Sequence, residues 1–161
     1  MIEDLADLAA PAGAALKDRK QSIAVADGAT GGLISAGLLT VPGATAFYVG
    51  GGIIYSFRGR DILLGVDEAQ LKGMKSVTET YALLQARAIR DRFGADWGIA
   101  ESGSAGPTHP FGVPAGKSCI AIVGPEVAVT RLVDTGSENR LANMEAFARA
   151  ALGFLNEVLG V

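Results

Sequence analysis

Residues 22–32 read Ser-Ile-Ala-Val-Ala-Asp-Gly-Ala-Thr-Gly-Gly, and this stretch decides the fold. An apolar run ends in a glycine-rich turn, and the helical pattern of residues 33–39 follows at once. Such a strand–turn–helix unit is typical of α/β proteins, because the turn presents free backbone N–H groups at the start of the helix. The turn therefore predicts a site for an anionic or polar ligand. Gly28 stands at its tip, so a nucleophilic side chain is missing there.

The composition indicates one domain spanning residues 1–161, with 49% hydrophobic and 19% charged residues. The net charge of −3 offers no basic surface, so we expect no nucleic-acid partner. The single cysteine, Cys119, excludes a disulfide framework and suits a reducing compartment. No apolar stretch approaches the ~20 residues of a membrane helix. We therefore expect a cytoplasmic protein without a membrane partner, and the sequence has no metal-ligand spacing.

Hydrophobic periodicity predicts that helices alternate with strands. We expect helices over residues 2–19 (with an interruption at Pro11), 33–39, 58–64, 67–72, 78–93 and 139–159. We expect strands over 22–26, 46–55 and 97–100, and a hairpin of residues 116–123 and 126–133. Asp67 and Thr78 suit helix N-caps. This order predicts a three-layer α/β/α sandwich on a mixed sheet.

Two glycine-rich loops follow two of the expected strands. The first is the turn at residues 28–32, and the second is Ser102-Gly103-Ser104-Ala105-Gly106-Pro107. Loops at the carboxyl ends of neighbouring strands converge on one crevice in an open α/β sheet. With Tyr55-Ser56 at the end of the second strand, the two loops predict a single ligand site.

Read in order, these segments resemble the CinA (competence/damage-inducible) C-terminal domain family, whose stand-alone members include the nicotinamide mononucleotide amidohydrolases. That family has A-E-S-C-T-G-G after strand one, a Y-S strand end with a lysine five residues beyond the tyrosine, and then S-G-x-A-G-P. The counterparts here are residues 26–32, 52–56 and 102–107. The resemblance spans nearly the whole chain. It implies an α/β/α fold with a five-stranded mixed sheet, a pocket for a small molecule such as a pyridine nucleotide, no cofactor, and a homo-oligomer.

Two departures from the family pattern bear on activity. The family's nucleophilic serine corresponds to Gly28, which has no side chain to attack a carboxamide. Its lysine base corresponds to Arg60, whose guanidinium keeps its proton and is no general base. Because both halves of the nucleophile–base pair are replaced, we expect a domain that keeps the pocket and lacks amidohydrolase chemistry.

The expected ligand-binding residues follow the retained motifs: Asp27, Thr30, Gly31, Gly32, Tyr55, Arg60, Ser102, Gly103, Ser104, Gly106 and Arg140. For the arginine of the family's G-D-R motif the sequence leaves two alternatives, Glu138 without a gap and Arg140 with a two-residue insertion; Arg140 is favoured because the last helix then keeps its length.

Several candidates also have plain structural interpretations. Thr30 suits a helix N-cap, Asp27 a solvated loop carboxylate, and Arg60 an ion pair with Asp61 or Glu68. His109, in a loop, has no motif around it, and Cys119 suits the core.

Two other functions stay open. The chain is an active nicotinamide mononucleotide amidohydrolase if Thr30, Ser102 or Ser104 replaces the nucleophile, with a base about 3 Å away. Tyr55, Asp27 and Glu101 are the candidate bases. Alternatively, the chain is a structural, oligomeric protein with a vestigial pocket, in which the apolar segment 47–54 pairs subunits.

Overall fold

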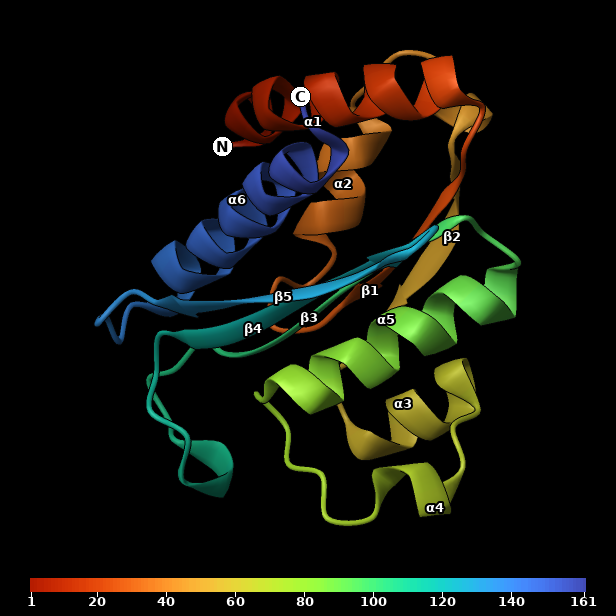
Figure 1. Cartoon of the computed structure of the whole chain (residues 1–161). Coiled ribbons are helices and arrows are strands. Elements are labelled where there is room, and N and C mark those ends of the chain that lie inside the picture. Colours follow the sequence, from red (N-terminus) through yellow and green to blue (C-terminus); the bar gives the residue numbers. More distant parts are fainter.

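A five-stranded mixed sheet lies between two layers of helices in the computed structural model, which describes residues 1–161 apart from the side chain of Pro110 (Figure 1). The elements are α1 (Ile2–Arg19), β1 (Ile23–Asp27), α2 (Leu33–Leu39), η1 (Ala44–Ala46), β2 (Tyr48–Ile53), α3 (Phe57–Leu64), α4 (Glu68–Leu71), α5 (Glu79–Phe93), β3 (Trp97–Ser104), η2 (Pro110–Gly112), β4 (Lys117–Gly124), β5 (Val127–Asp134) and α6 (Arg140–Leu159). The expected three-layer α/β/α architecture is confirmed.

The sheet has the strand order β2-β1-β3-β4-β5. Strand β1 is parallel to both β2 and β3, whereas β4 and β5 are antiparallel additions. The carboxyl ends of β1, β2 and β3 therefore lie at one edge of the sheet, where ligands of open α/β proteins bind.

Apolar side chains fill the space on both faces of the sheet. Helices α1, α2 and α6 cover one face, and α5 with α3 and α4 covers the other (Figure 1). Leu16 and Leu152 are fully buried in the first layer, and Ala86 is fully buried in the second. Both chain termini lie on the α1–α6 side of the sheet. Among the described residues, no helix combines the length and the apolar character needed to cross a membrane.

Two sequence expectations about element boundaries are wrong. Helix α1 continues through Pro11, which is exposed, so the carbonyl left without an N–H partner can face water. Strand β3 runs on to Ser104 instead of ending at Ala100, because β4 pairs with it as far as Ser104, which lies opposite Lys117. Long-range pairing thus overrides the local tendency of glycine to end a strand.

Side-chain caps fix the starts of four helices, and at α3 the hydroxyl of Ser56 accepts a hydrogen bond from the backbone N–H of Gly59. Asp67 accepts a hydrogen bond from the backbone N–H of Ala69 and forms a capping box at α4. Thr78 caps α5, and Asn139 caps α6. The expected caps at Asp67 and Thr78 are confirmed.

Glycine permits the close packing of α5 on the sheet. A Cβ added to Gly98 in β3 would lie 2.2 Å from the carbonyl oxygen of Ala86 and 2.8 Å from the Cβ of Arg90. By contrast, a Cβ at Gly153 in α6 would meet nothing within 4 Å.

We expect Gly98→Ala to destabilise the protein by roughly 1–3 kcal/mol, because α5 must move off the sheet. Gly153→Ala is the matched control and should stabilise by about 0.5–1 kcal/mol, since alanine restricts the unfolded chain and favours helix. Urea unfolding of both variants measures the difference. Equal stability of the two variants would contradict this packing.

Candidate functional site

A cavity of about 170 Å³ lies at the carboxyl edge of the sheet. Its wall combines the turn after β1, the segment after β2, the end of β3 and one face of α5. Aromatic rings of Tyr55, Phe57, Tyr81 and Phe111 line it, and the backbone of Gly28 faces it. The two glycine loops and the end of β2 were expected to converge, and residues of all three segments line this one cavity.

The aromatic residues form a wall suited to a planar ring. The rings of Phe57 and Phe111 have their centroids 5.4 Å apart with a 31° tilt. The guanidinium carbon of Arg60 lies 4.8 Å from the centre of the Phe57 ring. A cavity of about 150 Å³ can hold a benzene molecule, so this one has room for about one substituted ring.

A smaller cavity of about 50 Å³ holds the positive charge of the site. Arg140 lines it together with Tyr55 and Gly106. The guanidinium donates hydrogen bonds to the Gly106 carbonyl (2.7 Å) and to the Tyr55 hydroxyl (3.0 Å). The sequence left Arg140 and Glu138 as alternatives for the position of the motif arginine. Arg140 lies beside Tyr55 in the smaller cavity, whereas the carboxylate of Glu138 lies 3.6 Å from His109.

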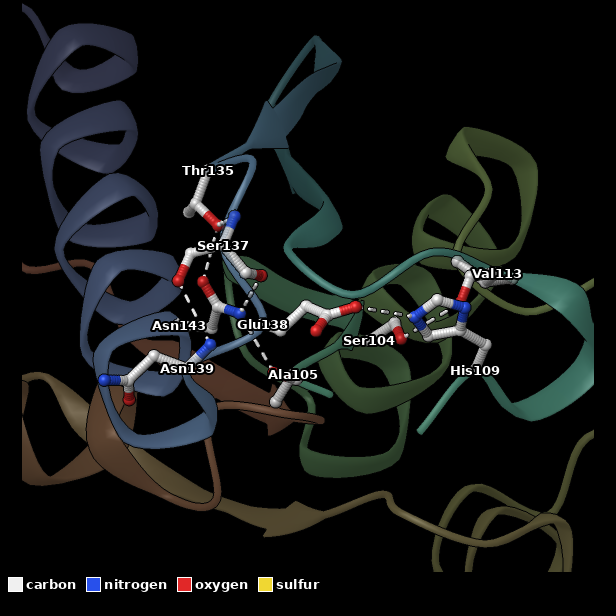
Figure 2. Close-up of polar contacts among 9 residues, drawn as sticks. All are labelled: Ser104, Ala105, His109, Val113, Thr135, Ser137, Glu138, Asn139 and Asn143. Carbon is white, nitrogen blue, oxygen red and sulfur yellow. Dashed lines mark hydrogen bonds and ion pairs between the residues drawn. The ribbon is translucent and has the colours of Figure 1, made fainter. Parts of the chain in front are cut away.

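Polar contacts tie the loop after β3 to the start of α6 (Figure 2). Asn143 donates hydrogen bonds to the carbonyls of Ala105 (2.9 Å) and Ser137 (2.8 Å), and it accepts one from Thr135. Nearby, His109 Nε2 lies 3.6 Å from the carboxylate of Glu138. These contacts hold Arg140, which begins α6, against the second glycine loop.

The turn after β1 rests on the buried carboxylate of Glu101. Glu101 Oε2 accepts hydrogen bonds from the backbone N–H groups of Thr30 (3.0 Å) and Gly28 (3.3 Å), and Oε1 accepts one from Ser118 (2.6 Å). Burial raises the pKa of Glu101, and the hydrogen bonds from Ser118 and Thr30 act in the opposite direction. Thus Glu101 fixes the turn to β3 and β4.

Asp27 fixes the other side of the same turn. Its Oδ1 accepts hydrogen bonds from the Thr30 hydroxyl (2.6 Å) and the Ile34 N–H (3.0 Å). Its Oδ2 accepts hydrogen bonds from the N–H and hydroxyl of Ser35. The interpretation of Asp27 as a solvated carboxylate is wrong, because its exposed fraction is 0%. Thr30 is not the N-cap either; Gly32 holds that position, and Asp27 binds the first helical N–H groups.

Gly28 allows the turn to approach β3 closely. A Cβ built on Gly28 would lie 2.2 Å from the carbonyl oxygen of Glu101. The φ angle of Gly28 is not in the left-handed region, so the obstacle to a side chain is this contact and not backbone strain. A residue larger than glycine therefore requires a shift of the turn or of β3.

The candidate nucleophilic hydroxyls already have partners. Ser102 Oγ accepts a hydrogen bond from the N–H of Val77, which has a φ of 57°, a rare value for a β-branched residue. Ser104 Oγ donates to the Val113 carbonyl at 3.4 Å. Of the three candidate hydroxyls, only that of Thr30 has a carboxylate at hydrogen-bond distance among the described residues, namely Asp27, and both residues are fully buried.

Two other sequence candidates lie outside the cavity wall. Arg60 pairs with Asp61 at 2.9 Å, one of its expected structural partners, and donates weakly to the Tyr81 hydroxyl. Cys119 is buried in the core, and burial raises the pKa of its thiol to about 11. Within the described part of the chain, no cluster of acidic, histidine and cysteine side chains suits a metal ion.

The structure sorts the expected ligand-binding residues into two sets. Those that line the two cavities are Tyr55, Ser102, Gly103, Ser104, Gly106 and Arg140. Those in or beneath the turn or beside the cavity are Asp27, Thr30, Gly31, Gly32 and Arg60. Ligand contact stays a prediction for all of them.

Sequence reasoning missed several lining residues. Tyr81 and Gln85 stand one turn apart on α5 and both line the cavity. The sequence could have indicated both residues, because each places a polar or bulky side chain on the otherwise small and apolar face of that helix. Phe57 and Phe111 carry no such signal.

The family model and the similar proteins of known sequence all belong to the CinA group. The model of a family described as the CinA C-terminal domain matches residues 5–159. A CinA-like protein of Chlorobium limicola is 36% identical over 157 residues, covering 92% of this chain and 37% of that protein. A CinA-like protein of Salinibacter ruber is 36% identical over 156 residues, covering 96% and 37%. The chain thus spans a little over a third of the length of these relatives.

Solved structures with the same fold cover the chain almost completely. A competence-damaged protein (CinA) superfamily protein of Klebsiella pneumoniae superposes with a TM-score of 0.89 at 27% identity, over 97% of this chain and 98% of that one. A competence/damage inducible protein of Agrobacterium tumefaciens gives a TM-score of 0.88 at 25% identity, over 98% and 96%.

Glu101→Gln should remove a pH dependence of stability. Because burial raises the pKa of Glu101, the folded state binds its proton more tightly than the unfolded chain does. Wild-type stability should therefore fall as pH rises from about 4.3, the ordinary value for Glu, through the folded pKa. The variant carries a neutral side chain of the same shape, so its stability advantage over wild type should grow across that window in urea titrations.

The comparison with wild type isolates Glu101 from other carboxylates. Lys117 and Arg131 lower the pKa values of Asp134 and Glu157, and these exposed groups contribute equally in both proteins. A stability difference that stays constant from pH 4 to pH 8 would mean that Glu101 is solvated.

Proposed function

The chain belongs to the CinA C-terminal domain family, and we propose that it is a ligand-binding member without the amidohydrolase chemistry that the family resemblance implies. The observation that carries this proposal is the contact at Gly28. Where the family pattern has a nucleophilic serine, this chain has no side chain. The carbonyl oxygen of Glu101 lies 2.2 Å from the place where a Cβ would stand.

The cavity geometry supports a ligand with one aromatic ring and one anionic group, such as a pyridine nucleotide. The larger cavity has aromatic walls and room for about one ring. Arg140 lies in the adjoining smaller cavity, where its guanidinium suits a phosphate or carboxylate. Tyr55 borders both cavities, so one molecule can extend from the first into the second.

An active hydrolase is the second candidate, and one distance favours it. The Thr30 hydroxyl lies 2.6 Å from Asp27, which meets the requirement for a nucleophile beside a base. However, both residues have an exposed fraction of 0%, and neither lines the cavity. Asp27 also accepts four hydrogen bonds, so it would have to release the start of α2 to take a proton.

The proposal also covers the oligomeric state of the protein and its location in the cell. Strand β2 is an edge strand that exposes Val49 and Ile53, and we propose that this face pairs subunits of a homo-oligomer. A cytoplasmic location agrees with the single buried thiol of Cys119.

The first test separates binding from turnover with nicotinamide mononucleotide. We expect calorimetry to detect binding, because the cavities offer a ring site and a cation. Ammonia release should stay below about one-hundredth of the ~1 s⁻¹ at the lower end of enzyme turnover. Release at enzyme-like rates would overturn the proposed loss of chemistry, and absence of binding would overturn the proposed ligand class.

The second test restores the two replaced positions. Gly28→Ser alone should stay inactive and lose about 1–3 kcal/mol of stability, because its Cβ meets the Glu101 carbonyl. Arg60→Lys alone should also stay inactive, since it supplies a base without a nucleophile. The double variant should release ammonia at a rate above the sum of the singles, because nucleophile and base act as a unit.

Circular dichroism and nucleotide binding control for misfolding of the double variant. A folded double variant that binds the nucleotide without hydrolysing it would show that loss of activity extends beyond these two positions.

A further inference from the structure

Gln85 has an unpaired amide oxygen and lies in the wall of the larger cavity. It lies on α5 one helical turn after Tyr81, and both residues line the cavity. Only 2% of Gln85 is exposed. Its Oε1 has no hydrogen-bond partner among the side chains and backbone groups that the structure describes. A buried amide oxygen without a partner destabilises a fold, so its presence at a cavity points to a ligand.

Other buried or half-buried amides of this chain differ from Gln85. The Oε1 of Gln21 accepts a hydrogen bond from the Trp97 indole at 2.9 Å. Asn143 uses both its amide nitrogen and its oxygen. The Oδ1 of Asn156 lacks a partner, but its nitrogen donates to Leu8 between α6 and α1, away from the cavities. Gln85 alone among these four combines a free oxygen with a place in the cavity wall.

The wall around Gln85 determines what can satisfy it. Among the described residues, none with a charged side chain lines the larger cavity. Arg60 is held by Asp61 and the Tyr81 hydroxyl instead. A group that meets the Gln85 oxygen must carry an N–H or O–H donor, and a neutral donor suits a wall without charged side chains. The aromatic walls and the volume of about 170 Å³ favour a donor on the edge of a single planar ring.

We propose that Gln85 is a specificity-determining residue that reads the polar edge of a planar aromatic ligand bearing an amide or exocyclic amine. This inference rests on the proposed function, because it assumes that the larger cavity holds a ring. It adds that the amide of Gln85, and not a charged group, selects the ligand. The residue keeps an unfavourable buried oxygen in the free protein and gains its hydrogen bond on binding.

Two ring probes of nearly equal shape test the inference. Benzamide carries an NH₂ group where acetophenone carries a methyl group, so only benzamide can donate to Gln85. Titrations followed by NMR chemical shifts should give wild type a preference for benzamide of about tenfold or more, the effect of one hydrogen bond to a buried acceptor. In Gln85→Met, the two probes should bind equally.

The melting temperature Tm distinguishes a ligand-reading role of Gln85 from a purely structural one, because the two roles predict changes of opposite sign on substitution. Gln85→Met removes an unpaired polar atom and should raise Tm by about 2–4 °C. The matched control Gln21→Met removes a paired amide outside the cavity, so it should lower Tm and leave the benzamide preference unchanged. Gln85→Leu tests the same prediction with a stiffer side chain.

The outcomes distinguish this inference from the proposed function. If both probes bind wild type equally and Gln85→Met changes nothing, the cavity holds rings but Gln85 does not read them. If Gln85→Met and Gln85→Leu lower Tm or fail to fold, the residue is structural, and the inference is likewise overturned. If neither probe binds wild type, the proposed ring site fails, and this inference fails with it.

Discussion

The contact between the carboxylate of Glu101 and the backbone of the first glycine turn organises this structure. Glu101 accepts hydrogen bonds from the N–H groups of Gly28 and Thr30 while its other oxygen binds Ser118. A carboxylate at 0% exposure is unfavourable unless such donors surround it. The contact joins the end of β1 to β3 and β4, so it sets the position of the turn against the cavity. Gly28 is required beside it, because a Cβ would overlap the Glu101 carbonyl.

Under the proposed function, this constraint separates ligand binding from chemistry within one site. The turn begins α2 and borders the cavity although Gly28 has no side chain. The anionic groups of the site, Asp27 and Glu101, lie beneath the turn and hold backbone N–H groups. The cationic group, Arg140, lies next to Tyr55 in the smaller cavity, which Ala29 of the turn also lines. A ligand would thus meet aromatic rings, neutral polar groups and one guanidinium.

Local sequence signals were enough to predict the elements that depend on near neighbours. The strand–turn–helix of residues 22–39 and the final hairpin follow from periodicity and glycine placement, and the structure has both. The end of β3 was not predictable, because its glycine is stabilised by pairing with β4. The interruption expected at Pro11 is absent for a similar reason. Pro11 is exposed, and the packing of α1 against α6 outweighs the hydrogen bond that the proline removes.

The site was predictable in its motifs and not in its packing. Tyr55, Ser102 and Arg140 came from motif order, and they line the cavities. The pairing of Phe57 with Phe111 joins segments far apart in the chain, and no local pattern encodes it. The burial of Asp27 depends on the helix that it caps, so its sequence position suggested a solvated loop residue. The role of Glu101 required knowing that the turn lies on β3.

The most direct test of this account is a ¹³C NMR titration of the Glu101 carboxyl carbon, assigned by comparison with Glu101→Gln. The pKa of Glu101 should lie above the ordinary value of about 4.3 for Glu, because burial disfavours the charged form. The amide signals of Gly28 and Thr30 should shift with the same midpoint, since both N–H groups donate to this carboxylate. An ordinary pKa, with amide signals that do not follow it, would contradict the account.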